Sequence, residues 1–331
     1  MKPKKLLPIY SALITVLIIS ALLSLSLGAA RLSVHQMISG IIGTKGFSYE
    51  RTIMLSVRLP RLLSSILAGI GLSLAGVILQ SVMGNELASP NTVGVSSGAG
   101  LAAVICLSLF PSLSHLLPIG AFFGALGTSI LIMALSRIIG GGKTTIILAG
   151  IALSSLFGAG ISFFSVLDTD VLASYSAFSV GGFSGVKMSD LTLPVILILI
   201  CVFLAIALSK EIAILSLGDT IASGLGISPN KIRVVSLMIA SLSVASVISF
   251  SGLLGFVGLV VPHITRKLLG SELKYQLTAA PLVGASLVTL SDLAGRIIFA
   301  PSEISVGIIM AFIGAPFLFV LLLGRREKNN A

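Results

Sequence analysis

Long runs of apolar residues without charge divide the chain into segments of about the length of a membrane-spanning helix. A bilayer core is about 30 Å thick, and about 20 apolar helical residues cross it. The runs are continuous, whereas the strands of a membrane barrel alternate apolar and polar residues. We therefore expect an all-α integral membrane protein with about ten transmembrane helices. The charge-free windows are 5–31, 61–86, 86–137 (two spans), 143–168, 190–210, 233–266 (one span and a short second one), 275–291 and 304–324.

Composition supports the same fold class. Of the 331 residues, 56% are hydrophobic and only 10% are charged, against about 25% charged residues in soluble domains. The connections between the spans are too short for a soluble domain, so residues 1–331 are predicted to form a single transmembrane domain. The apolar run 6–30 is too long for a signal peptide, which predicts an uncleaved first span.

The net charge of +10 raises the possibility of a nucleic-acid partner. The basic residues are instead spread over short loops, so we expect a membrane and no nucleic acid. An even number of spans puts both termini on one side. Placing them in the cytoplasm leaves 14 of the 21 basic residues inside, in agreement with the positive-inside rule. The seven outside are Arg31, Lys45, Arg51, Arg58, Arg61, Lys187 and Arg296.

Candidate catalytic, nucleotide and metal motifs are incomplete. Residues 140–144 (GGGKT) lack the first glycine of a phosphate loop and a preceding strand. Cys106, Cys201 and the three histidines show no ligand spacing. We expect no enzyme activity, no cofactor and no bound metal. Any nucleotide energy must come from another chain.

Two arginines open the second predicted span from the outside. Arg58-Leu59-Pro60-Arg61 places Pro60 well for a first helical position, but both charges oppose the helix dipole and the topology rule. One interpretation is that the arginines reach lipid phosphates. The other is that they bind carboxylates of an external partner.

The inner end of that span is predicted to contribute to a translocation path. Glycine and small residues at 69–76 favour close helix packing, and polar Gln80 and Asn85 follow, either lining a path or bridging helices. Ser89-Pro90 predicts a helix start. Irregular backbone at membrane depth is tolerated only against protein or a water-filled cavity. The path candidates are therefore Gln80, Asn85, Ser89, Pro90, Ser96 and Ser97.

The loop at 210–230 contains a candidate amphipathic helix. Leu217, Ile221 and Leu225 recur every four residues and share one face if helical. Asp219 is suited to begin this helix, and Gly224 or Gly226 to end it. An apolar face in the cytosol needs an occupant: this chain, the headgroup layer or a cytosolic subunit.

Several motifs together resemble those of the FecCD or vitamin-B12-type (type II) permeases of bacterial iron–siderophore, haem and cobalamin ABC importers. The matching stretches, in the order found in that family, are RLPR (58–61), NELASPNTVGVSSGAG (85–100), LGDTIASGLGIS (217–228), GFVGLVVPHITRKLLG (255–270), SDLAGR (291–296) and EISVGIIMAFIGAPFLFVLL (303–322). They cover nearly the whole chain. One departure is Glu86, where the family usually has proline.

The resemblance implies the type II importer fold in a bacterial cytoplasmic membrane, and it implies partners. These are a second permease, identical or related, two ATPase subunits and an external substrate-binding protein that delivers an iron–siderophore complex. It implies that Arg58, Arg61 and Arg296 meet acidic residues of the binding protein. The implied ATPase contact comprises Leu217, Gly218, Asp219, Ile221, Ala222, Leu225 and Gly226.

Two alternatives to a siderophore permease remain at this point. Haem or cobalamin would suit the same fold. An ion-coupled secondary transporter belongs to a different class, and such proteins carry ionisable residues within their spans. Here Asp292 is the main such residue, and it is close to the end of a span.

Overall fold

The computed structural model describes residues 6–28, 32–43, 46–113, 115–140 and 142–329, and within these ranges the regular structure is helical, with no strand. The basic residues Lys2, Lys4, Lys5, Arg31 and Lys45 lie outside the described residues. The predicted all-α class is confirmed. The helices are α1 (Leu6–Ser26), α2 (Val34–Ile42), α3 (Ser48–Thr52), a π-helical turn (Ile53–Arg58), α4 (Leu59–Met83), α5 (Val95–Leu109), α6 (Leu116–Ile138), α7 (Lys143–Leu167), α8 (Thr169–Val180), α9 (Met188–Ala207), α10 (Ser209–Ser216), α11 (Asp219–Gly224), α12 (Pro229–Ser251), α13 (Val257–Leu269), α14 (Leu273–Ile297) and α15 (Val306–Asn329).

Each of the ten predicted spans corresponds to a helix. Seven helical segments among the described residues are long and apolar enough to cross a membrane: α1, the run Ser48–Met83, α6, α7, α9, α12 and α14. Helix α5 and the apolar part of α15 are shorter, and α13 has 13 residues. Of the three, only α13 lies in a window predicted to hold one span and a short second one, 233–266.

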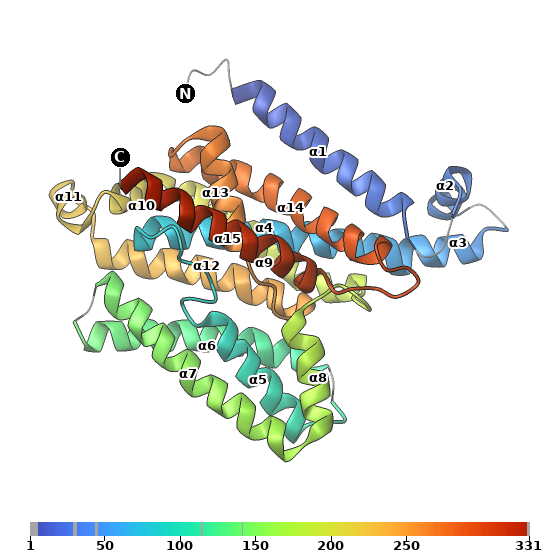
Figure 1. The fold of residues 1–331 in the computed structure, drawn as a ribbon, viewed down its shortest axis with the longest axis horizontal. Helices are drawn as coiled ribbons and strands as arrows, with labels where there is room; N and C mark the ends of the chain where they lie inside the picture. The colour runs from blue at the N-terminus through green and yellow to red at the C-terminus, as the bar shows by residue number, and fades with distance from the viewer. Residues whose placement is uncertain (1–5, 29–31, 44–45, 114, 141, 330–331) are drawn as a thin grey trace.

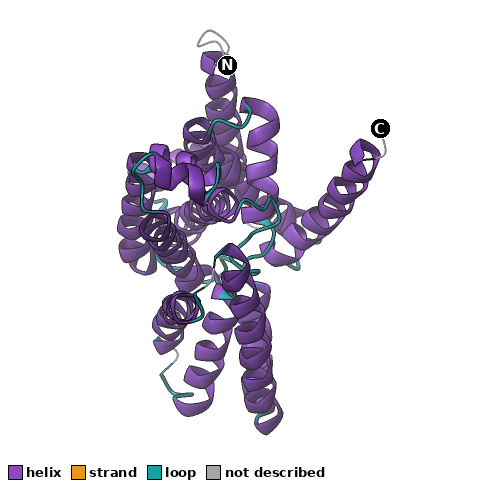
Figure 2. Ribbon diagram, turned by 90° about the vertical axis from the view of Figure 1, so that its left-hand side faces the viewer, coloured by secondary structure: helices purple, strands orange, loops and turns teal. Residues whose placement is uncertain are grey.

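The helices form two groups around α12 (Figure 1). Helix α4 packs against α14, α12, α13 and α9, while α5 packs against α6, α7 and α8. Helix α12 contacts both α4 and α6 and so joins the groups. Helix α1 lies along α14 at the edge of the bundle, and the C-terminal end of α15 leans away from it (Figure 2).

Helix α4 reaches three neighbours through three glycines. A Cβ on Gly69 would lie 2.3 Å from the Gly284 carbonyl oxygen of α14, and one on Gly76 would lie 2.0 Å from that of Gly258 in α13. Gly71 faces α12, where the Ser243 hydroxyl donates to its carbonyl at 3.0 Å. The small residues therefore allow backbones to approach closely, as predicted for this segment.

The second span begins earlier than the sequence indicated. Helical structure runs without interruption from Ser48 through the π-helical turn into α4, so Pro60 and the two arginines lie inside a helical run rather than at its start. Proline lacks an N–H and clashes with the carbonyl one turn earlier in a regular α-helix. The wider π-helical turn directly before it provides room, and π turns often occur at functional sites.

Two of the connections between the predicted spans contain helices. The segment 31–57 holds α2 and α3, and 168–190 holds α8. The Asp168 side chain begins α8 by accepting from the backbone N–H groups of Asp170 at 2.8 Å and Val171 at 3.4 Å. A carboxylate cap of this kind stabilises a short helix whose length does not suffice to cross a membrane.

Candidate functional site

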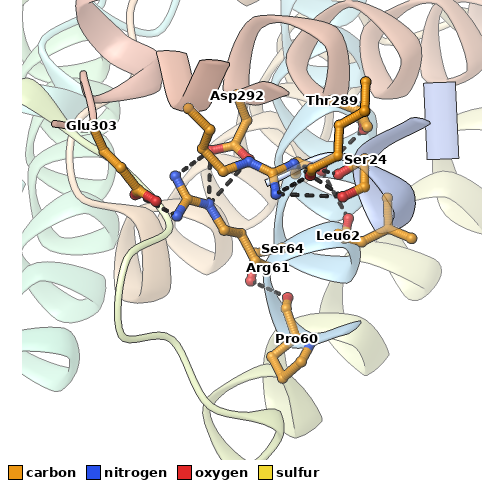
Figure 3. A network of polar contacts seen from close by, with 11 residues as sticks. Ser24, Pro60, Arg61, Leu62, Ser64, Thr289, Asp292 and Glu303 are labelled. Carbon is orange, nitrogen blue, oxygen red and sulfur yellow. Dashed lines mark hydrogen bonds and ion pairs between the residues drawn. The ribbon is translucent and has the colours of Figure 1, made fainter. Parts of the chain in front are cut away.

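The three arginines predicted to dock an external protein come together at one end of the bundle, where Figure 3 shows Arg61 between Asp292 and Glu303. Arg61 donates from Nε and Nη2 to the carboxylate of Asp292 at 3.1 Å, and from Nη1 to Glu303 at 2.6 Å. Nε of Arg296, one turn after Asp292 on α14, lies 3.2 Å from Oδ2 of the same carboxylate. A single buried carboxylate therefore serves two guanidinium groups from α4 and α14.

Arg58 and Arg296 also hold the end of α1. Arg58 donates to the carbonyl oxygens of Leu25 and Ser26, and Arg296 donates to the Ser24 carbonyl at 3.3 Å and its hydroxyl at 2.7 Å. The last carbonyls of a helix lack intrahelical partners and carry negative partial charge. The two cations therefore stabilise the C-terminal end of α1 and attach this peripheral helix to the bundle.

The arginines are buried, with exposed fractions of 5% for Arg58, 8% for Arg61 and 6% for Arg296. Their internal partners, Asp292 and Glu303, were absent from the predicted site. The spacing of Asp292 and Arg296 by four residues is a signal that could have identified one pair. No spacing rule connects Arg61 with Glu303, because their contact depends on how α4 meets the start of α15.

At the opposite end of α4, a glycine ends the helix. Gly84 has φ +60°, its N–H bonds the Ser81 carbonyl, and the N–H of Asn85 bonds the Gln80 carbonyl. This is the Schellman arrangement, which favours glycine in the left-handed region. The expected helix start at Ser89-Pro90 is wrong: α5 begins at Val95, after Gly94 with φ +82°.

Instead of starting a helix, the residues before α5 form turns held by side chains. The Ser89 hydroxyl accepts from Thr92 N–H at 3.4 Å, and the Thr92 hydroxyl accepts from Ser89 N–H at 2.8 Å. Pro90 is buried in a small cavity shared with Leu72 and Gly258. These hydroxyl contacts compete with helix formation and account for the later start of α5.

Gln80 bridges helices. It is buried, donates to the Gly258 carbonyl of α13 at 3.4 Å and accepts from Arg266 at 3.3 Å. Arg266 also pairs with Glu86, the residue that stands in place of the family's proline. An ion pair therefore attaches the turn after α4 to the C-terminal part of α13.

Of the remaining candidates for the translocation path, Asn85 lines an open groove, and Ser96 and Ser97 bond neighbouring side chains. Asn85 lines a groove of about 410 Å³, together with Asn91, Thr92 and residues of α7. Ser96 donates to Asn91 at 2.5 Å, and Ser97 bonds Ser154 of α7 at 3.1 Å. Polar side chains from the turn and from α7 therefore face each other at this groove.

The predicted inner helix exists but is shorter than expected. Helix α11 covers Asp219–Gly224 only, and Asp219 is its first residue rather than its cap. Gly226, with φ +80°, ends it as predicted, because its N–H bonds the Ser223 carbonyl and that of Ile227 bonds the Ala222 carbonyl. The six-residue length reflects glycines on both sides, at 218 and 226.

The apolar residues of this segment are exposed. Leu217 is 63% exposed, Ile221 51% and Leu225 62%, while Ala222 on the other side of α11 is fully buried. Asp219 pairs at 2.6 Å with the buried Arg233 of α12. The ion pair and Ala222 attach the segment to the bundle and leave its apolar side chains without cover in this chain.

Among the described residues, no group of three or more His, Cys, Asp or Glu side chains could hold a metal ion. The site therefore consists of two ends of one bundle, with a buried charge network at one and an exposed apolar segment at the other.

Comparison with known proteins relates this chain to membrane permeases. The model of the FecCD transport family matches residues 16–324. The chain is 35% identical over 318 residues to the Fe(3+)-citrate import system permease YfmE of Bacillus subtilis, covering 96% of this chain and 95% of that protein. It is 34% identical over 326 residues to the hemin transport system permease HmuU of Yersinia pestis, covering 96% of each.

A solved structure described as an inward-facing conformation of a metal-chelate type ABC transporter has 30% sequence identity and a TM-score of 0.86, and the match covers 96% of this chain and 99% of that one. The family consists of membrane permease subunits of ABC importers, in which a separate subunit hydrolyses ATP. The family match over nearly the whole length, together with the helical bundle, shows that this chain belongs to the FecCD transport family.

Proposed function

We propose that this protein is the permease of an importer that moves a ferric chelate, of the siderophore or citrate type, from an external binding protein into the cytoplasm. Relatives named for Fe(3+)-citrate, ferric enterobactin and hemin support an iron-bearing substrate. The chelate shields the metal, so no metal-ligand cluster is needed along the path. Two copies of the permease, or this chain and a related one, would enclose that path.

The observation that carries the proposal is that one membrane bundle has two unlike ends. Cationic groups lie where α4 and α14 meet at one end, and exposed apolar side chains lie on α11 at the other. An importer driven from inside requires a substrate-delivering partner on one side and an energy-supplying partner on the other.

At the outer end, we propose that Arg58, Arg61 and Arg296 form the docking site for the binding protein. Arg61 lines a cavity of about 320 Å³ that also includes Glu303, so an incoming carboxylate has a route to it. Arg61→Glu should weaken docking, and an acidic-to-basic change on the binding protein should partly restore it. Arg51→Glu, at an exposed outer arginine, is the matched control.

At the inner end, we propose that Leu217, Ile221 and Leu225 enter a groove of the ATPase subunit, the usual use of an exposed apolar helix face. The groove beside Asn85 would then belong to the translocation path, and both termini would lie in the cytoplasm. Reporter fusions at the C-terminus that give an extracytoplasmic signal would contradict this orientation.

Transport in proteoliposomes tests the function directly. Permease, ATPase and binding protein should together take up iron-labelled citrate or siderophore complexes, with ATP required and vanadate inhibiting. Uptake of haem or cobalamin in preference to ferric chelates would reassign the substrate. Uptake without the ATPase and driven by an ion gradient would overturn the ABC mechanism for this chain.

A further inference from the structure

Arg61 lies between two carboxylates that differ in their access to solvent. The side chain of Asp292 is 2% exposed, whereas that of Glu303 is 35% exposed. Asp292 receives three hydrogen bonds from Arg61 and is also close to Arg296. Asp292 is therefore a fixed part of the network, and Glu303 is the member that solvent reaches.

The attachment of Glu303 is also the weaker one. It receives one hydrogen bond from Arg61, through Nη1, and lies outside the helices in the connection from α14 to α15. The next residue is fixed, because Ile304 N–H bonds the Gly295 carbonyl at 2.9 Å. Rotation of the Glu303 side chain alone would thus release Nη1 of Arg61 without moving the backbone.

A cavity lies next to this pair. Arg61 and Glu303 line it together with serines and apolar residues, among them Ser184, Ser305 and Phe183. Of the described residues that line this cavity, Arg61 is the cationic side chain that a carboxylate could pair with. Among the described residues, the three arginines and two carboxylates of this cluster carry one positive charge in excess, which favours binding of an anionic group.

We propose that Glu303 is an internal competitor that occupies Arg61 in the undocked permease and is displaced by a carboxylate of the binding protein. This inference rests on the docking function proposed above. Asp292 remains bonded to Arg61 throughout, and the exchange gives Nη1 a new acceptor in place of Glu303, since a buried donor without a partner is unfavourable. Glu303 would therefore weaken docking and favour release of the binding protein after delivery.

The test is the affinity of the binding protein for the permease in lipid nanodiscs. Glu303→Gln keeps the shape of the side chain and removes its charge, so it should tighten binding by about two- to fivefold, the usual worth of a partly exposed ion pair. Glu50→Gln removes one negative charge from the same end of the molecule without touching Arg61. That control separates loss of competition from a general change in surface charge.

A double-mutant cycle makes the outcome decisive. In an Arg61→Ala background, Glu303→Gln should no longer change the affinity, because the competitor has lost its target. Unchanged or weaker binding of Glu303→Gln alone, with Arg61→Ala still impaired, would overturn the competitor and leave the docking function intact. Unchanged binding in both single variants would overturn the docking function itself. Thermal unfolding of each variant in the nanodisc verifies that the bundle remains folded.

Discussion

The two ends of the bundle differ in which side chains are buried and which are exposed. At the end that we propose to be outer, charged side chains are buried and paired with one another, so that Arg61 and Arg296 share Asp292. At the opposite end, which we propose to be inner, apolar side chains such as Ile221 are left exposed. A partner at the outer end must compete with existing internal contacts, whereas a partner at the inner end adds contacts that the chain does not make by itself. We expect reversible docking outside and lasting association inside.

Removing the carboxylate that Arg61 and Arg296 share should strongly destabilise the bundle. Asp292→Ala would leave two buried guanidinium groups without their common counter-charge, and breaking a buried pair in this way costs about 3–5 kcal/mol. Thermal unfolding in nanodiscs should show a large loss of stability. Glu272→Ala, at an exposed carboxylate just before the other end of α14, is the control and should leave unfolding unchanged.

Adding charge to the inner segment should abolish its association with the ATPase. Burying one leucine is worth about 1.5–3 kcal/mol, so Ile221→Asp with Leu225→Asp should weaken assembly by tens-fold or more, with the cost of burying charge added. Co-purification of the ATPase measures this. Thr220→Asp with Ser223→Asp places the same charge on exposed polar positions of α11, and ATPase retention should survive. Equal retention by both double variants would show that the apolar residues are not the contact.

The helix that connects the two ends should tolerate little added volume. A Cβ at Gly76 of α4 has no space beside Gly258 of α13, whereas a Cβ at Gly127 of α6 would meet nothing within 4 Å. Gly76→Ala should cost about 1–3 kcal/mol by overpacking, and Gly127→Ala should be neutral within error. Thermal unfolding of the two variants in nanodiscs would measure this difference in stability. Equal stability would mean that the α4–α13 crossing adjusts freely.

Sequence reasoning predicted the elements well and their long-range partners poorly. Apolar run length located the spans, and the glycine expected to end the short helix after Asp219 does so at Gly226, because these features depend on neighbouring residues. The network around Arg61 joins α4, α14 and the start of α15, and no local pattern specifies that meeting. For the same reason, the three docking candidates were predicted as a surface and lie buried in the structure.

The salt dependence of the two associations tests the contrast between the ends most directly. Affinities of the binding protein and of the ATPase for the permease would be measured in nanodiscs at low and high sodium chloride. Screening weakens charge pairs and leaves apolar burial nearly unaffected. We predict that affinity for the binding protein falls about tenfold or more between low and high salt, while affinity for the ATPase is unchanged or slightly higher. A salt-independent outer partner together with a salt-sensitive inner one would contradict this account.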